Sequence, residues 1–311
     1  MPETVLKKGS KFPVACVNDV FNTVKGKSTL AILAQKVPVK FNGNRRFTFA
    51  MDGEVNFKGE NDLHSAGKVS MTPVDMVPIE VEYGARVSKD FMHAAEEEKL
   101  EILKEFNEGF AGKLARGLDI GAFHGVNPRT GNACAQITQH LDKGTKTVSY
   151  DAAKCDDNVD DAIALIGDYD VTGIAMAKTF SSAMSKLTGP TGAKLYPELK
   201  WGGQPKEVNG VPTSVNSTVS YNDSIDEAIV GDFANAIKWG YAKDVEMEVI
   251  PYGDPDNTKV DLQAAGQVYI RATAYIGWAI MDENAFARIV RDPEAAAVNE
   301  EPDDNGNGED A

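Results

Sequence analysis

The stretch EEEKLEILKEFNEGFAGKLARGLDIGAFHG, residues 96–125, decides how the rest of the chain is interpreted. Apolar side chains recur along it every three or four residues, at Leu100, Leu103, Phe106, Phe110, Leu114 and Leu118. This spacing lines them up on one face of an α-helix, and that face is built for burial. Glutamates open the run, where the helix dipole favours anions, and glycines from Gly117 onward are expected to end it. The pattern predicts one long helix over about residues 96–120.

The segment before this helix is too polar to bury itself. Residues 38–73 are punctuated by glycine and asparagine, and within RRFTFAM Phe47 and Phe49 alternate with Arg46 and Thr48. The alternation predicts a long two-stranded hairpin. Because so little of this hairpin is apolar, we expect it to be either disordered or packed on another molecule.

The remaining segments have simpler patterns. Residues 1–22 read as an extended arm, and Ser28 is positioned to cap a short helix. Short helices and strands are mixed over residues 156–250, which indicates a compact α/β unit, and a β-rich run follows. From Asp292 to the end there are eight acidic residues and no basic ones, so residues 292–311 are expected to be a disordered tail. The fold class is α+β.

Composition excludes several classes of protein. The chain has 311 residues, a net charge of −15 and an isoelectric point near 4.8, which argues against a dedicated reader of nucleic acids. It has no run of eighteen apolar residues, and its beginning lacks the apolar core of a signal peptide. We therefore expect it to be made in the cytoplasm.

No catalytic or metal-binding constellation stands out. Gly26-Lys27-Ser28 would end a phosphate-binding loop, but Phe21 stands where the loop needs its first glycine. Cys16, Cys134 and Cys155 have no metal or redox spacing, and neither do the histidines, which are His64, His93, His124 and His140. The sequence predicts no catalytic residue, no cofactor and no metal, which argues against an enzyme.

The order of these parts resembles the major capsid proteins of tailed bacteriophages, those with the Hong Kong 97-type fold. In that family a long spine helix ends in an aspartate and a glycine-rich turn, as LDIGAFHGVNPRTG does here. Further matches are IEVEYGARVSKDF before the helix, Asn209-Gly210-Val211-Pro212, Gly231-Asp232-Phe233, and VYIRATAYIGWAI followed by Ala285-Phe286.

The resemblance implies a division of the chain. Residues 1–22 would be the N-terminal arm, 38–73 the extension loop (E-loop), and 151–250 the axial domain. Residues 23–37 and 74–150 would form the peripheral domain with the spine helix, and 251–291 would return to it as a β-rich segment. The implied contacts with a neighbouring subunit come from the E-loop, and the implied core comes from the spine helix. The E-loop residues are Phe47, Phe49, Phe57, Lys58 and Lys68; the spine residues are Leu103, Phe106, Phe110, Leu114 and Leu118.

By the same resemblance, the protein would assemble as pentamers and hexamers into an icosahedral phage head, part of the virion, around double-stranded DNA that it binds without sequence specificity. A separate scaffolding protein, a portal and a decoration protein would be its partners, and it would not contact a membrane. Two alternatives stay open. One is an encapsulin, a cellular compartment shell with the same fold, and the other is a soluble α+β metabolic enzyme.

The chain departs from some family members in two respects. Its start lies almost at the arm, so a separate scaffold or earlier cleavage is expected. Some members link subunits covalently through a lysine and an asparagine with a glutamate catalyst, whereas Asp261 and Gln267 stand near those two positions here. Covalent cross-linking is therefore not expected.

Overall fold

The structure is a computed structural model and describes residues 24, 27–52, 55, 57, 67–90, 96–222 and 224–291. The predicted N-terminal arm, Lys58 near the hairpin tip and the acidic tail after residue 291 lie outside the described residues. The chain divides into two compact units. Unit 1 comprises Met1–Lys143 and Phe233–Glu283, and unit 2 comprises Gly144–Asp232 and Asn284–Ala311.

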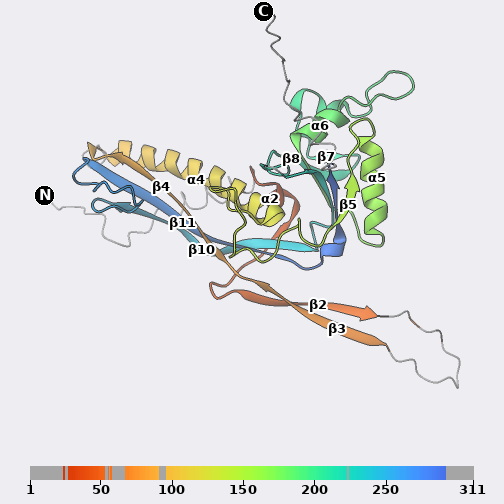
Figure 1. The fold of residues 1–311 in the computed structure, drawn as a ribbon, viewed down its shortest axis with the longest axis horizontal. Helices are drawn as coiled ribbons and strands as arrows, with labels where there is room; N and C mark the ends of the chain where they lie inside the picture. Colours follow the sequence, from red (N-terminus) through yellow and green to blue (C-terminus); the bar gives the residue numbers. More distant parts are fainter. Residues whose placement is uncertain are drawn as a thin grey trace, which may run out of the picture. The chain divides into compact units, whose positions relative to one another are not determined.

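Unit 1 is built on a four-stranded sheet with the strand order β1-β10-β11-β4 (Figure 1). Strand β11 pairs antiparallel with both of its neighbours, and β1 runs parallel to the start of β10. Burial alternates along most of β11, as expected for a strand with one covered face. The strands are β1 (Gln35–Lys36), β4 (Ile79–Ser88), β10 (Ile237–Ile250) and β11 (Gln267–Ile280).

Helix α4 (Glu96–His124) packs its apolar stripe into unit 1. Its 29 residues make a rod about 43 Å long. Leu103 packs in one buried cluster with Val268 and Ile270 of β11, and Phe106 lies against that cluster while staying partly exposed. Phe110, Leu114 and Leu118 are buried.

The C-terminal end of α4 differs from the sequence prediction. Glycines were expected to end the helix near residue 120, but it continues through Gly117 and Gly121 to His124. A Cβ atom on Gly121 would lie 2.8 Å from the ring of Trp278, so this glycine allows the helix to approach β11 closely. The helix ends instead at Gly125, whose positive φ of 66° suits a glycine after a helix.

The buried carboxylate of Asp119 joins α4 to the short helix α2 (Thr29–Leu33). It accepts hydrogen bonds from Ser28 Oγ at 2.5 Å, from the Thr29 amide at 2.9 Å and from the Leu30 amide at 3.0 Å. Ser28 Oγ in turn accepts from the Ala31 amide at 3.1 Å, which confirms Ser28 as the N-cap. The negative charge thus sits on the first amides of α2, where the helix dipole stabilises it.

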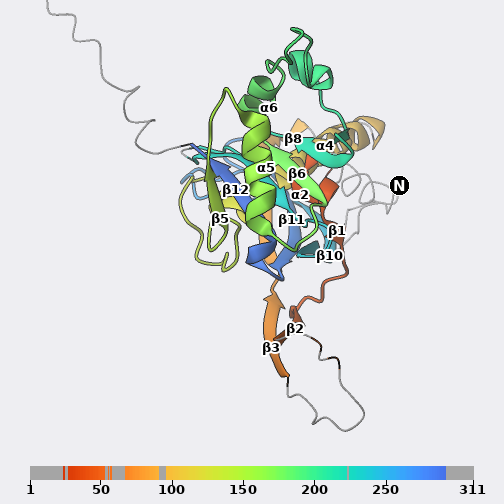
Figure 2. The same cartoon turned by 90° about the vertical axis from the view of Figure 1, so that its right-hand side faces the viewer.

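Unit 2 contains a mixed six-stranded sheet, in the order β5-β12-β9-β6-β8-β7, with helices α5 and α6 against it (Figure 2). Phe180 of α6 and Ile166 of α5 are buried. The elements are β5 (Lys146–Ser149), α5 (Cys155–Ile166), β6 (Gly173–Met176), α6 (Lys178–Met184), the 3-10 helix η1 (Pro197–Gly202), β7 (Glu207–Val208), β8 (Val211–Val215), β9 (Asp226–Gly231), the 3-10 turn η2 (Glu283–Ala285), which begins at the last residue of unit 1, and β12 (Phe286–Val290).

The two units differ from the expected division in two places. Strand β10 was expected in the α/β unit over residues 151–250, but it pairs with β11 in the sheet of unit 1. The whole segment 251–291 was expected to return to the peripheral domain as a β-rich segment. Instead, β12 is a strand that pairs with β9 and β5 in unit 2. In both cases, pairing with strands distant in the sequence determines where a segment belongs.

Replacing Phe110 by alanine is expected to lower the free energy of unfolding by about 3–5 kcal/mol, because the ring is fully buried and a cavity would remain. The same change at Phe106 is expected to cost less, because that ring is partly exposed. Urea unfolding of the unassembled subunit, followed by circular dichroism, measures both values. Equal losses at the two positions would contradict this account of the helix.

Replacing Asp119 by alanine is expected to lower the free energy of unfolding by about 2–4 kcal/mol, because buried donors at the start of α2 lose their acceptor. Asparagine keeps one acceptor oxygen and should cost less. The exposed Glu108 on the same helix provides a matched control. Its replacement by alanine should change stability by no more than about 0.5 kcal/mol.

Candidate assembly surfaces

The hairpin of unit 1 has two chemically different faces. Strands β2 (Asn44–Asp52) and β3 (Lys68–Met76) pair antiparallel and are drawn in orange in Figure 1. Directly opposite residues in such a pair share a face of the ribbon. Phe49 lies opposite Met71, and Met51 opposite Val69, so alternate positions bring apolar side chains together. We call this the apolar face; it consists of Phe47, Phe49, Met51, Val69 and Met71.

The apolar face is open to solvent in the single chain. Its side chains range from 56% exposed at Phe47 to 72% exposed at Met51. The other face of the ribbon carries polar side chains, including Arg46, Thr48 and Ser70. A contiguous exposed apolar patch on a soluble chain marks a surface that another molecule covers.

The base of the hairpin is anchored in unit 1. Val74 and Met76 at the end of β3 are buried in a cluster with Val37, Val39 and Ala279. Between Val74 and Met76, Asp75 lies opposite Arg45 and forms a bidentate ion pair with it, with nitrogen–oxygen distances of 2.8 and 3.0 Å.

The Arg45–Asp75 pair shifts the pKa of both groups. Hydrogen bonding to Arg45 lowers the pKa of Asp75, and the same contact raises the pKa of Arg45. Both side chains are largely exposed, so water weakens the attraction, and the pair serves mainly to fix the strand register. The hairpin is therefore held at its base and free along its apolar face.

The remaining E-loop residues predicted from the sequence are solvent-exposed where they are described. Phe57 is 95% exposed and Lys68 is exposed, whereas Lys58 lies outside the described residues. Met51, Val69 and Met71 were not among the residues predicted from the sequence. The signal was present in KVSMTPVDM, where Val69 and Met71 alternate with Ser70 and Thr72.

A second exposed element of unit 1 is the loop that joins β10 to β11. Arg86 of β4 holds this loop through hydrogen bonds to Asp254 at 2.9 Å and to Asp256 at 2.8 Å, and it also bonds Thr258 and the Val260 carbonyl. Hydrogen bonding to Arg86 lowers the pKa of Asp256 to about 2. Arg86 thus stabilises the conformation of this loop, in which the side chains of Tyr252 and Val260 are exposed to solvent.

The two residues considered for covalent cross-linking, Asp261 and Gln267, also lie at this loop. Asp261 accepts hydrogen bonds from the amides of Gly253, Gln263 and Ala264. Gln267 Oε1 lies 3.5 Å from Arg86 Nη1. Both residues contribute to the shape of the loop.

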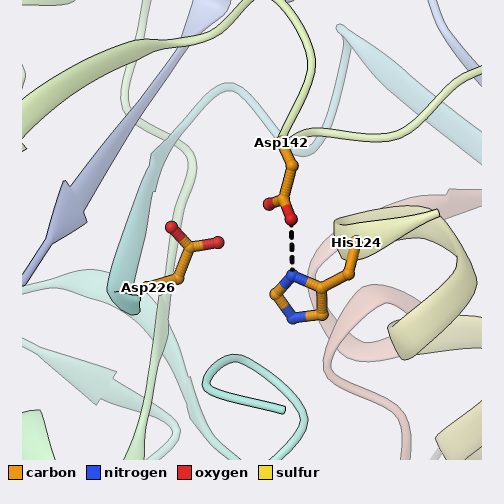
Figure 3. Close-up of side chains that lie close together, drawn as sticks. All are labelled: His124, Asp142 and Asp226. Carbon is orange, nitrogen blue, oxygen red and sulfur yellow. Dashed lines mark hydrogen bonds and ion pairs between the residues drawn. The ribbon is translucent and has the colours of Figure 1, made fainter. Parts of the chain in front are cut away.

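Of the four histidines in the sequence, His124 pairs with Asp142. Its Nδ1 lies 2.9 Å from Asp142 Oδ2 at the C-terminal end of α4 (Figure 3). The Asp142 amide also donates to the Phe123 carbonyl, so the segment after the helix is fastened to the last turn. Asp226, also drawn in Figure 3, belongs to unit 2, where it accepts a hydrogen bond from Arg288 at 2.8 Å.

Comparisons with known proteins agree on one family. A family model described as the phage capsid family matches residues 13–290. A solved structure from Mycobacterium phage Ogopogo is 27% identical in sequence, with a TM-score of 0.73, and the match covers 86% of this chain and 92% of that chain. One from Gordonia phage Cozz is 20% identical, with a TM-score of 0.71 and coverages of 94% and 91%.

A structure described as the capsid of a native GTA particle is 15% identical, with a TM-score of 0.61, and the match covers 94% of this chain and 95% of that chain. No curated protein matches the sequence. Within the part of the chain that the structure describes, no helix combines the length and the apolar character needed to cross a membrane.

Replacing Arg86 by glutamine is expected to return the pKa of Asp256 from about 2 toward its ordinary value of 3.8. Because the folded pKa is the lower one, the contact favours folding above about pH 4 and is lost as the pH falls toward 2. A carboxyl-carbon NMR titration of the unassembled subunit measures the shift. Arg271→Gln is the control, because Arg271 pairs with Glu248, and an equal shift in that variant would contradict the assignment.

Proposed function

This chain belongs to the phage capsid family and is a major capsid protein, and from that premise we infer how it joins its neighbours. Many copies assemble into a capsid shell. We propose that the β2–β3 hairpin is the E-loop and that its apolar face lies on an adjacent subunit. The observation that carries this proposal is the exposure of Phe47, Phe49 and Met51 on one side of a ribbon whose base is anchored in unit 1.

The energetics favour docking of this face. Fully burying a large apolar side chain is worth about 1.5–3 kcal/mol, and the apolar face has several. A two-stranded ribbon also has unpaired backbone groups along its outer edges, which a neighbouring chain can satisfy. Repeated head-to-tail contacts of this kind close into rings, as a shell requires.

The resemblance supports a finer assignment of the two units. Unit 1 is the peripheral domain with α4 as its spine helix, and unit 2 is the axial domain near the centre of each ring. The rings are pentamers and hexamers of an icosahedral head that encloses double-stranded DNA. The net charge of −15 fits a shell that contains DNA without gripping it by sequence.

We also propose partner proteins and a place of synthesis for the subunit. A separate scaffolding protein, a portal and a decoration protein would act with it, and synthesis would take place in the host cytoplasm before incorporation into the virion. The family match does not favour the two alternatives, a cellular compartment shell and a soluble metabolic enzyme.

The double substitution Phe47→Thr with Phe49→Thr tests the docking of the apolar face. Threonine keeps the strand propensity, and both rings are exposed in the single chain, so the free energy of unfolding of the subunit should change by no more than about 0.5 kcal/mol. Shell formation should be lost or strongly reduced. Sedimentation velocity and negative-stain electron microscopy measure the assembled fraction.

The matched control places two threonines on the opposite face, as Arg46→Thr with Ser70→Thr. These variants should assemble like the unmodified chain. Normal shells from the phenylalanine variant, or equal defects in both variants, would refute the role given to the apolar face.

A further inference from the structure

Unit 2 carries two oppositely charged surfaces, which are separate from the hairpin of unit 1. One lies on helix α5 and the other on the segment between α6 and β7. In Figure 2, α5 faces the viewer, and the segment, green to teal, extends at the top. Residues 151–170 contain seven aspartates and one lysine, a net charge of −6, whereas residues 186–206 contain four lysines and one glutamate, a net charge of +3.

The acidic face of α5 consists of Asp157, Asp160 and Asp161, with Ile163 and Leu165 at its flanks. The three aspartates follow helical spacing opposite the buried side of the helix, and all three are exposed. Ile163 and Leu165 are also exposed. The helix dipole accounts for acids in the first turn but fades beyond it, so it does not explain Asp160 and Asp161.

The basic loop consists of residues 186–206. Its lysines, Lys186, Lys194, Lys200 and Lys206, are exposed, and so are Leu195 and Trp201. The loop is not slack, because the buried side chains of Tyr196 and Leu199 anchor it. The Gly189 amide bonds the Ala193 carbonyl, and Lys194 Nζ bonds the Lys186 carbonyl. The backbone that carries the lysines is therefore held in place.

Trp201 is the most unusual residue of the basic loop. Its side chain is 94% exposed, with Lys200 Nζ 4.9 Å from the centre of the ring. Its backbone has φ 58° and ψ 32°, in the left-handed region that bulky residues rarely adopt. A strained backbone that holds an aromatic ring in water points to a binding role for the ring.

The two surfaces do not satisfy each other within one chain. Among the described residues, no ion pair joins the acidic face to a lysine of the basic loop. Two different complementary patches on one molecule suit a heterologous contact, in which each copy offers one patch to each of its two neighbours.

We propose that the acidic face of α5 in one copy binds the basic loop of the next copy, with Trp201 packed against Ile163 or Leu165. This inference rests on the proposed function and adds the residues through which unit 2 closes a ring. Opposite charges orient the two copies as they meet, and the apolar side chains between them exclude water. The contact should weaken at high salt.

A charge-exchange experiment on the full chain tests the proposal. One variant carries Asp160→Lys with Asp161→Lys, a second carries Lys200→Glu with Lys206→Glu, and a third combines all four changes. Each single-surface variant should need about tenfold more protein for half-maximal assembly, and the combined variant should recover most of that loss. Sedimentation velocity, which separates subunits, rings and shells, provides the measurement.

Two further variants sharpen the test. Lys154→Glu adds negative charge at an exposed position beside the acidic face, so by this proposal it should not weaken assembly. Trp201→Gly removes the ring and relieves the left-handed strain. The unassembled subunit should therefore be at least as stable as the unmodified chain, while its assembly should weaken.

The outcomes separate this inference from the proposed function. If the unmodified chain assembles and the charge variants assemble equally well, or if the combined variant shows no recovery, the inference is wrong and the proposed function stands. A third outcome is that only the variant Lys200→Glu with Lys206→Glu is impaired and its shells retain less DNA. The basic loop then binds DNA, and the inference is again wrong. An unmodified chain that remains a monomer at high concentration would overturn both.

Discussion

The structure of unit 1 depends on one buried charge. Asp119 is completely buried, and burying a carboxylate is costly unless hydrogen-bond donors surround it. The donors come from Ser28 and the first amides of α2, about ninety residues earlier in the chain. These hydrogen bonds hold α2 against the long helix. After α2 the chain passes through β1 to Val37 and Val39, which pack against the base of the hairpin. The carboxylate on α4 thus holds the start of the segment that leads to the hairpin base.

The sequence predicted the parts whose physics is local. The spacing of Phe110, Leu114 and Leu118 indicated the buried stripe of α4, and Ser28 indicated the N-cap of α2. Helical spacing and helix capping could be predicted because they depend on residues only a few positions apart. The end of α4 could not be predicted in the same way. Gly121 resembles a stop signal, but its role is to admit the Trp278 ring, and that ring comes from a strand more than 150 residues away.

Pairing between distant strands was also invisible in the sequence. The segment FARIV after residue 285 has an apolar character that suits either a helix or a strand, and its pairing with β9 and β5 decides the matter. The hairpin shows the same limit in another form. Alternation at Phe47 and Phe49 revealed one half of the apolar face, but only the register with β3 adds Val69 and Met71 to the same side. A surface made from two strands is defined by their pairing.

The two surfaces proposed for assembly have different physics, and a shell made of one kind of subunit benefits from both. Removing the apolar face from water stabilises the assembled state. This stabilisation depends on close contact and only weakly on salt. The acidic face and the basic loop act through charge, which falls off slowly with distance and so tolerates small changes in angle. In the proposed rings of five and six subunits, the same two patches would meet at slightly different angles. The proposed charged contact in unit 2 would serve both rings, while the hairpin, held at its base by Val74 and Met76, would keep its apolar face on the neighbour.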